Sequence, residues 1–324
     1  MKKNKKRVVF FNGKFVEEQN AKISIYDSAL MFGDMVFEMT RSFNKEQFLI
    51  EQHIDRLFSG LKILRIKIKY SKKDLINICK LTVKKNEKTM NKDDEHRLMI
   101  DVSRGLLEIY ENTQKHKGSN VIVADFPLKW TVQGMGQIFK NGINAVITSQ
   151  RAIPPIYMDP KIKNRSRMFY LNANIEASLH KGINNWALLL DSNGFISEGT
   201  GSNFFMVKDG KVFTPRGICI LRGITRNYII ELCNELKIPI VETDIEPFDV
   251  YNADEAFFSA TPFCMLPVIS LNGLKIGNGS RGKIYNKILK YWSDKVNVDI
   301  EKQIVNWDKT KQKKNNKLSP YKFK

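Results

Sequence analysis

The sequence predicts an α/β protein of two domains, a small α+β domain followed by a larger mixed α/β domain. Three observations support this class. The chain has 324 residues and 42% of them are apolar, which is sufficient for two cores of ordinary size. The first part contains hairpin patterns followed by helical periodicity. The second part alternates short apolar runs with helical patterns, as in mixed α/β domains.

The N-terminal domain is expected to begin with a small antiparallel hairpin. Asn12-Gly13 separates two apolar runs, and this dipeptide favours a type I′ turn because both residues tolerate positive φ. Apolar residues at i, i+3 and i+4 predict a helix over 51–66, and Ser71 with Asp74 predicts the capped start of a second helix. The strands of this domain are expected over 8–11, 15–16, 36–43, 47–50, 97–102 and 121–126.

A cluster of proline and glycine residues between 127 and 142 interrupts the pattern, and the domain boundary is placed there. Strands of the second domain are expected over 144–148, 187–191, 203–207, 211–213, 239–242, 255–259 and 266–269. Its helices are expected over 165–181, 225–236 and 282–292. The resulting division is a basic tail (1–7), the small domain (8–127), an interdomain loop (128–142), the large domain (143–295) and a second basic tail (296–324).

The formal net charge of +19 by itself suggests a nucleic-acid partner. Much of the excess, however, lies in the two lysine-rich tails, where aromatic residues are sparse. We therefore expect solvated tails and no nucleic-acid site. No apolar stretch reaches the length of a membrane span or of a signal-peptide core, so a soluble cytoplasmic protein without a membrane partner is expected.

The cysteines and histidines show no metal-binding pattern. Cys79, Cys219, Cys233 and Cys264 have no CxxC spacing, and the four histidines are equally scattered. Such cysteine usage suits a reducing compartment and argues against a disulfide framework. No metal site is expected.

One segment contains the candidate chemistry. Lys163, in the run PKIK, lies just before a predicted helix, and Lys161 is a neighbouring alternative. Glu198 lies in the glycine-rich turn GFISEGTGSN. The run Gly223-Ile224-Thr225 begins a predicted helix, where unpaired N–H groups and the helix dipole favour an anion. An amine, a carboxylate and an anion-binding helix start are the groups that pyridoxal phosphate needs from a protein.

These motifs, together with LRGITR and FFSATPF, resemble the class IV (fold type IV) pyridoxal-phosphate enzymes. This family includes branched-chain aminotransferases, D-amino-acid aminotransferases, (R)-selective amine transaminases and aminodeoxychorismate lyases. The resemblance extends from about Phe10 to Trp292. It implies a D-amino-acid-aminotransferase-like fold, pyridoxal 5′-phosphate as cofactor, and a homodimer in which each active site takes residues from the partner's small domain.

The resemblance also implies roles for individual residues. Ala177 of NIEA follows Lys163 by fourteen residues, as in the family's lysine region, so Lys163 is expected to form the Schiff base and to move the proton between Cα and C4′. Glu198 corresponds to the glutamate that keeps the pyridine nitrogen protonated. Arg56, in EQHIDRL, corresponds to the phosphate arginine, and Thr261, in FFSATPF, to a hydroxyl donor from a later turn.

Three departures from the family concern the substrate. Branched-chain enzymes have a tyrosine shortly after the lysine, and near that place this chain has Arg167, a cation that still suits the cofactor's phenolate. Pro262 follows Thr261 and has no N–H to donate to a substrate carboxylate. The run SRG at 103–105 continues as LLEIYEN, which lacks the Arg-x-His carboxylate trap of the D-amino-acid aminotransferases.

Two groups of residues are candidates for substrate contacts. Arg165 or Arg167 is expected to bind an acid group, because a guanidinium fork suits a carboxylate. Pairing of Arg165 with an acid such as Asp159 is the alternative. Phe37 and Arg41 alternate on one predicted strand and are expected to line the substrate side, with a solvent-facing Arg41 as the alternative.

We therefore expect an aminotransferase that exchanges an amino group between an amino acid, branched-chain-like or related, and a 2-oxo acid. The enzymatic alternatives are a pyruvate-forming lyase of the aminodeoxychorismate type, which would use Lys163 and Glu198 in the same way, and a D-amino-acid or (R)-amine transaminase. A non-catalytic basic binding protein with the same fold is a further alternative. The joint presence of Arg56, Lys163, Glu198 and Thr225 argues against it.

Overall fold

In the computed structural model, which describes residues 6–113 and 115–309, the chain divides into two units. Unit 1 contains the described residues up to Thr131 together with Ile162–Ser166. Unit 2 contains Val132–Lys161 and the described residues from Arg167 onward. The step from Thr131 to Val132 lies inside the segment 128–142, and the return of Ile162–Ser166 to unit 1 was not expected from the sequence.

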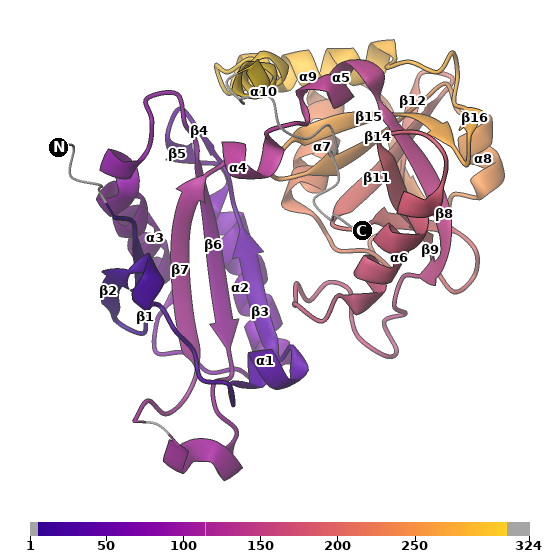
Figure 1. Ribbon diagram of the computed structural model, residues 1–324. Helices are drawn as coiled ribbons and strands as arrows, with labels where there is room; N and C mark the ends of the chain where they lie inside the picture. Colours follow the sequence, from indigo (N-terminus) through magenta and orange to yellow (C-terminus); the bar gives the residue numbers. More distant parts are fainter. Residues whose placement is uncertain (1–5, 114, 310–324) are drawn as a thin grey trace. The chain divides into compact units, whose positions relative to one another are not determined.

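Unit 1 is built on an antiparallel sheet with the strand order β2-β1-β7-β6-β3 (Figure 1). Its strands and the short hairpin beside it are β1 (Val8–Phe11), β2 (Lys14–Glu17), β3 (Met35–Met39), β4 (Ser42–Phe43), β5 (Glu46–Gln47), β6 (His96–Ser103) and β7 (Asn120–Pro127). Its helices are η1 (Glu18–Asn20), α1 (Ser28–Phe32), α2 (Ile50–Ile63), α3 (Lys72–Asn86), η2 (Glu87–Thr89) and η3 (Glu108–Thr113), and α4 (Lys129–Val132) crosses into unit 2.

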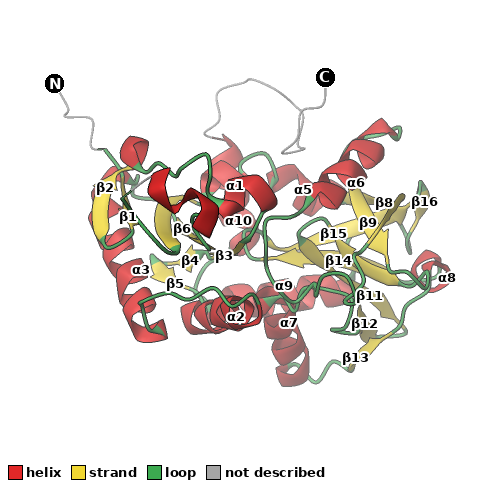
Figure 2. Cartoon of the chain, turned by 90° about the horizontal axis from the view of Figure 1, so that it is seen from below, coloured by secondary structure: helices red, strands yellow, loops and turns green. Residues whose placement is uncertain are grey.

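Local sequence signals explain several of these elements. Asn12 and Gly13 have φ of 49° and 98°, as a type I′ turn requires, so the predicted β1–β2 hairpin is confirmed. Ser71 and Asp74 form the predicted capping box at the start of α3. Helices α2 and α3 cover one face of the sheet and bury a shared apolar core with it (Figure 2). The residues of β3 and β6 that alternate with these core residues therefore point to the face of the sheet that α2 and α3 do not cover.

The strand predicted over 36–43 is interrupted. β3 ends at Met39, and Ser42–Phe43 pairs with Glu46–Gln47 in a separate small hairpin, β4–β5. Asn44 and Lys45 have positive φ, which ends the extended conformation, and both N–H groups donate to the carboxylate of Glu95. Arg41 consequently lies beyond the end of β3 and does not continue the alternation that begins at Phe37.

Unit 2 is built on one mixed sheet. Its strands are β8 (Ile143–Arg151), β9 (Asn185–Leu190), β10 (Ile196–Gly199), β11 (Ser202–Lys208), β12 (Lys211–Pro215), β13 (Ile240–Thr243), β14 (Glu255–Ala260), β15 (Cys264–Leu271) and β16 (Leu274–Lys275). Its helices are α5 (Gly136–Asn141), α6 (Met168–Leu179), α7 (Ile224–Glu235), α8 (Pro247–Tyr251), α9 (Lys283–Lys295) and α10 (Ile300–Lys309).

The sheet of unit 2 closes on itself. The order β10-β9-β8-β15-β14-β11 is completed by a pairing of β10 with β11, and β12 and β13 extend from β11. Helix α6 packs on β8 and β9, whereas α7 and α9 pack on β14 (Figure 1). On the neighbouring strands β11 and β14, Phe204 is paired with Phe258 and Phe205 with Phe257, and all four side chains are fully buried. These aromatic pairs fix the strand β11, which follows directly after Glu198 and its turn.

Two segments contain helices that were not predicted. The segment 128–142, predicted as a loop, contains α4 and α5, and the segment 296–324, predicted as a basic tail, contains α10. Helix α10 buries Ile300, Ile304 and Trp307 on one face, and Asp308 accepts hydrogen bonds from the N–H groups of Gly134 and Gly136. Residues 1–5 and 310–324 of the predicted tails lie outside the described residues. None of the helices in the described ranges is long and apolar enough to cross a membrane.

Candidate active site

Lys163 lies in a bent segment that is joined to β3 by one isolated bridge. The carbonyl oxygen of Lys163 accepts a 2.9 Å hydrogen bond from the N–H of Phe37, and Asn164 forms a bridge with Val36. Nζ of Lys163 is 4.9 Å from the centroid of the Phe37 ring. Lys161, the alternative from the sequence, belongs to unit 2 and forms an ion pair with Asp159 at 2.8 Å.

Arg56 is held in a fixed orientation by a buried carboxylate. Nε and Nη2 of Arg56 donate to the two oxygens of Glu38 at 2.6 and 2.9 Å, and Nδ1 of His53 lies 2.8 Å from the same carboxylate. Burial works to raise the pKa of Glu38, but the charge of Arg56 and the hydrogen bonds from Arg56 and His53 outweigh burial and hold that pKa far below its ordinary value. Burial lowers the pKa of His53, so its neutral ring donates from Nδ1 to an ionised Glu38.

Unit 1 contains two buried arginines whose charges interact, Arg41 after the end of β3 and Arg97 on β6. Arg41 is only 1% exposed, so it does not face solvent; its Nε donates to the carbonyl of Ser42, and its Cζ lies 3.8 Å from the centroid of the Phe43 ring. Arg97 is 7% exposed, and burial together with the charges of Arg41 and Arg165 lowers its pKa to about 9. Nε and Nη1 of Arg97 have no hydrogen-bond partner among the described residues.

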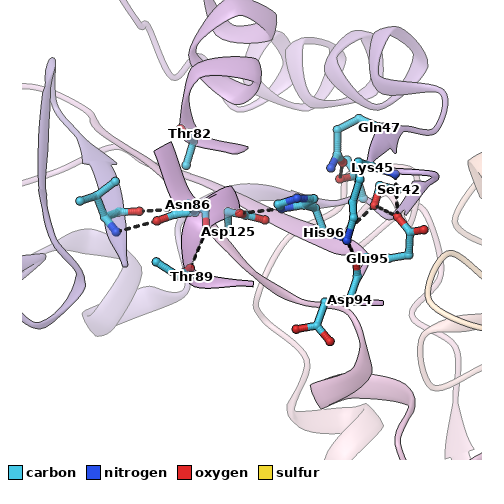
Figure 3. A network of polar contacts seen from close by, with 12 residues as sticks. Ser42, Lys45, Gln47, Thr82, Asn86, Thr89, Asp94, Glu95, His96 and Asp125 are labelled. Atoms are coloured by element: carbon cyan, nitrogen blue, oxygen red, sulfur yellow. Dashed lines mark hydrogen bonds and ion pairs between the residues drawn. The ribbon is translucent and has the colours of Figure 1, made fainter. Parts of the chain in front are cut away.

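A network of polar contacts holds the hairpin next to Arg41 (Figure 3). The carboxylate of Glu95 accepts hydrogen bonds from the hydroxyl of Ser42 and from the N–H groups of Asn44 and Lys45. The N–H of His96 donates to the Ser42 hydroxyl at 2.7 Å. Because Ser42 also supplies the carbonyl that receives Nε of Arg41, the network fixes the backbone on which this arginine depends.

Arg165 is paired with an acid, as the alternative from the sequence proposed, but the acid is Asp101 of β6. Nη2 of Arg165 donates to Oδ1 of Asp101 at 3.0 Å, and Cζ of Arg165 lies 3.7 Å from the centroid of the Phe37 ring. Unit 1 thus brings Phe37, Lys163 and Arg165 together. Among the arginines of unit 1, Arg97 is the stronger candidate for an anionic ligand, because two of its buried donors lack partners among the described residues.

In unit 2, Glu198 is a buried carboxylate surrounded by donors. It is 4% exposed; Oε1 accepts from the hydroxyl of Tyr170 at 2.6 Å, and Oε2 accepts from Nδ2 of Asn203 at 3.2 Å and from the N–H of Leu221 at 3.0 Å. Burial and the charge of Glu198 raise the pKa of Tyr170 well above its ordinary value, so its hydroxyl remains a donor. Three donors favour the ionised form of the carboxylate.

The start of α7 is linked to Glu198 through Asn203. Gly223 is the N-cap of this 12-residue helix, and no side chain among the described residues caps it. A Cβ on Gly223 would lie 2.1 Å from Oδ1 of Asn203, so any other residue here would displace the side chain that donates to Glu198. The first N–H groups of α7, at Ile224 and the buried Thr225, suit an anion.

The other predicted residues of unit 2 lie in two places. Arg167 precedes α6, and its Cζ is 5.2 Å from the centroid of the Tyr170 ring, which connects it to the surroundings of Glu198. Thr261 and Pro262 lie in the turn between β14 and β15, where Ala260 pairs with Cys264. Cys264 has φ of 64°, a conformation typical of the last position of such a turn.

These residues fit pyridoxal phosphate. The buried, ionised carboxylate of Glu198 suits a protonated pyridine nitrogen, and the start of α7, which lacks a side-chain cap among the described residues, suits a phosphate. Glycine at 223 leaves space for the side chain of Asn203, which donates to Glu198. Unit 1 offers the amine of Lys163 and the oriented guanidinium of Arg56.

Sequence reasoning missed Arg97. The strand over 97–102 was predicted, and alternation along it would have placed Arg97 on the same face as Asp101, opposite the apolar residues Leu98 and Ile100. The missing signal was burial, because an arginine near the end of a strand is normally solvated, and only the packing around Arg97 shows that it is buried.

The sequence and the fold of this chain are similar to those of known aminotransferases. The family model described as amino-transferase class IV matches residues 35–271. The putative branched-chain-amino-acid aminotransferase of Methanocaldococcus jannaschii is 33% identical over 287 residues, which cover 88% of this chain and 95% of that protein. The crystal structure of the branched-chain amino acid aminotransferase of Escherichia coli matches with a TM-score of 0.81 and 30% identity, over 90% of this chain and 94% of that chain. The corresponding T.th. enzyme, in complex with N-(5′-phosphopyridoxyl)-L-glutamate, matches with a TM-score of 0.78 and 26% identity over the same shares.

Proposed function

Because the chain belongs to the class IV aminotransferases and is a pyridoxal-phosphate-dependent transaminase, we propose that it transfers the amino group of a branched-chain amino acid to a dicarboxylic 2-oxo acid. The names of the relatives support the branched-chain donor. The incomplete pairing of Arg97 among the described residues supports the dicarboxylic acceptor and is the observation that carries the substrate assignment.

An anion is needed next to Arg97. A buried charge without partners costs several kcal/mol (roughly 3–5) relative to a paired one. The charges of Arg41 and Arg165 add to the positive potential around Arg97. The second carboxylate of 2-oxoglutarate or glutamate would accept a charge-assisted hydrogen bond from Nε or Nη1 of Arg97, the two nitrogens that lack a partner among the described residues. The side chain of a branched-chain substrate would instead contact the ring of Phe37.

We assign the cofactor-binding roles as follows. Lys163 would attach pyridoxal phosphate covalently and would move the proton at the substrate Cα. Glu198 would keep the pyridine nitrogen protonated, and Arg167 would stabilise the phenolate. Arg56, the hydroxyl of Thr261 and the N–H groups at Gly223-Ile224-Thr225 bind the phosphate. When bound, the cofactor supplies an electron-withdrawing ring that stabilises negative charge at Cα.

A spectroscopic titration tests the proposed function. The purified holoenzyme is expected to show a visible absorption band and to lose it when a branched-chain amino acid or glutamate is added without any oxo acid, because the amino group moves to the cofactor. L- and D-amino acids are added singly. A band that no amino acid changes would contradict transamination and favour the lyase alternative, and the absence of any band after addition of pyridoxal phosphate would contradict the cofactor roles.

Arg97→Met is expected to raise KM for 2-oxoglutarate by about 30-fold or more, because a buried charge pair with the second carboxylate is lost. KM for a branched-chain 2-oxo acid should change less than about threefold, since that acid has no second carboxylate. The thermal stability of the apoprotein should not fall, because the change removes a buried cation that is incompletely paired within the described residues.

Arg226→Met is the matched control. Arg226 is also a buried arginine, but it donates to the carbonyl of Pro215 and to Glu242. Its replacement should lower thermal stability and leave the ratio of the two KM values unchanged. An equal rise of both KM values in Arg97→Met would refute the assignment of Arg97 to the second carboxylate.

We also propose that the enzyme is a homodimer, as the family resemblance implies. Unit 1 exposes several large apolar side chains within and just before α1, and such groups mark interaction surfaces. They are Ile23, Ile25, Leu30 and Phe32. Sedimentation velocity of the holoenzyme at micromolar concentration is expected to give the mass of two chains, and the mass of one chain would contradict the proposal.

We also propose a cytoplasmic location, which the state of the cysteines supports. All four cysteines are free thiols, and three of them are buried, as is usual for proteins of reducing compartments. Recovery of the protein in the membrane or secreted fraction of cells that express it from its own gene would contradict this location.

A further inference from the structure

Tyr170 directs its hydroxyl at the carboxylate of Glu198 from the first turn of α6. The hydroxyl donates to Oε1 of Glu198 at 2.6 Å, and both residues are buried in unit 2. Nδ2 of Asn203 and the N–H of Leu221 donate to Oε2 of the same carboxylate. A carboxylate that is held through one oxygen can still turn about that oxygen, whereas donors to both oxygens fix its plane. Tyr170 therefore contributes to the orientation of Glu198.

The ring of Tyr170 is itself held by an apolar cluster between α6 and the sheet. The buried members of this cluster are Val146, Ala152, Tyr170, Ala173, Ala177, Ala187 and Leu189. Helix α6 packs on β8 and β9, and β9 pairs with β10, the strand that contains Glu198. A close-packed ring keeps one side-chain conformation, so the hydroxyl stays directed at the carboxylate.

The hydroxyl of Tyr170 keeps its proton and so acts as a donor. Burial and then the charge of Glu198 raise the pKa of Tyr170 well above its ordinary value. The charge of Arg167, whose Cζ lies 5.2 Å from the centroid of the ring, opposes this rise without cancelling it. A hydrogen bond donated to a carboxylate favours its ionised form, and a protonated ring nitrogen pairs with that form.

We propose that Tyr170 is a positioning residue whose hydroxyl holds Glu198 ionised and oriented toward the ring nitrogen of the cofactor. This inference rests on the proposed function in one respect, the contact of Glu198 with that nitrogen. The partner of the hydroxyl and the cluster around the ring both belong to unit 2, so the carboxylate is oriented before the cofactor binds.

The test compares the binding of two cofactors to the apoprotein by equilibrium dialysis. They are pyridoxal phosphate and 1-deazapyridoxal phosphate, in which a C–H group replaces the ring nitrogen. Tyr170→Phe removes the hydroxyl and retains the packed ring. Its Kd for pyridoxal phosphate is expected to rise by about 10-fold, because Glu198 loses a hydrogen bond that favours its charge. Its Kd for the deaza analogue should change by less than about twofold, since the analogue has no nitrogen for Glu198 to face.

Tyr285→Phe is the matched control. Tyr285 is also a buried tyrosine of unit 2, but its hydroxyl donates to the backbone carbonyl of Met265 at 3.2 Å and not to a carboxylate. The same hydroxyl is removed, so any general effect on the packing of unit 2 is reproduced. Both Kd values should stay within about twofold of those of the unchanged protein.

Three results would contradict these expectations in different ways. Equal rises of the two Kd values in Tyr170→Phe would overturn the proposal, because the loss would then come from the structure of unit 2. Tighter binding of pyridoxal phosphate by this variant would overturn it as well, because the hydroxyl would then compete with the ring nitrogen for the carboxylate. If the unchanged protein binds both cofactors equally, the proposed contact of Glu198 with the nitrogen fails instead, so the two failures are distinguishable.

Discussion

Lys163→Ala is expected to lower kcat of transamination by at least about 10⁴-fold, because attachment of the cofactor and proton transfer at Cα depend on the same amine. Pyridoxal phosphate should still bind through the phosphate and Glu198 contacts, but borohydride should no longer fix it covalently to the protein. Steady-state kinetics and mass spectrometry after reduction measure the two effects. Added methylamine is expected to restore part of the lost activity, since it supplies a base in the space of the missing side chain.

Lys161→Ala is the control for this change, because Lys161 is only two positions away and is paired with Asp159. It should retain kcat within about threefold and remain covalently labelled after reduction. Labelling of Lys161 in the unchanged protein, or full activity in Lys163→Ala, would show that the choice between the two lysines is wrong. The structural reason for the choice is that Lys163, held by the N–H of Phe37, places Nζ near the Phe37 ring, whereas Lys161 is paired with Asp159.

Glu198→Gln is expected to lower kcat by about 10²- to 10³-fold, the range found when a preorganised electrostatic contact is removed from an active site. Glutamine has nearly the same shape and retains one oxygen as an acceptor, but it has no charge to hold the pyridine nitrogen protonated. The three donors around Glu198 would lose part of their partner as well. Stopped-flow measurement of the first half-reaction with a branched-chain amino acid measures the effect directly.

Glu255→Gln provides the matched control. Glu255 is also a buried glutamate of unit 2, and its carboxylate accepts hydrogen bonds from the N–H groups of Ile284 and Tyr285 at the start of α9. Its replacement should lower thermal stability, because an anion at a helix start is stabilising, and should leave kcat unchanged. Equal losses of kcat in the two variants would indicate that Glu198 acts through the stability of unit 2 and not on the cofactor.

Local patterns predicted most of the helices and strands. The helix α3, with its capping box, and the β1–β2 hairpin depend on neighbours in the sequence, so their signals were complete within a few residues. The elements that were missed depend on distant contacts. Helix α10 is amphipathic, but it lies in a lysine-rich segment, and its contacts with Gly134 and Gly136 join residues more than 170 positions apart. The break after Met39 likewise depends on Glu95, which is distant in the sequence.

By itself, the sequence determined the two-part α/β organisation, the family and the candidate residues Lys163, Glu198 and Arg56, because these follow from short motifs and from apolar periodicity. The tertiary structure decided which charges are paired. Arg165 pairs with Asp101, while Arg97 lies buried with donors that no described residue satisfies. The sequence does not distinguish a paired arginine from an unsatisfied one, because the packing around the side chain sets its exposure to water and its partners. Burial and pairing arise from strands that are far apart in the chain, so no local pattern contains them.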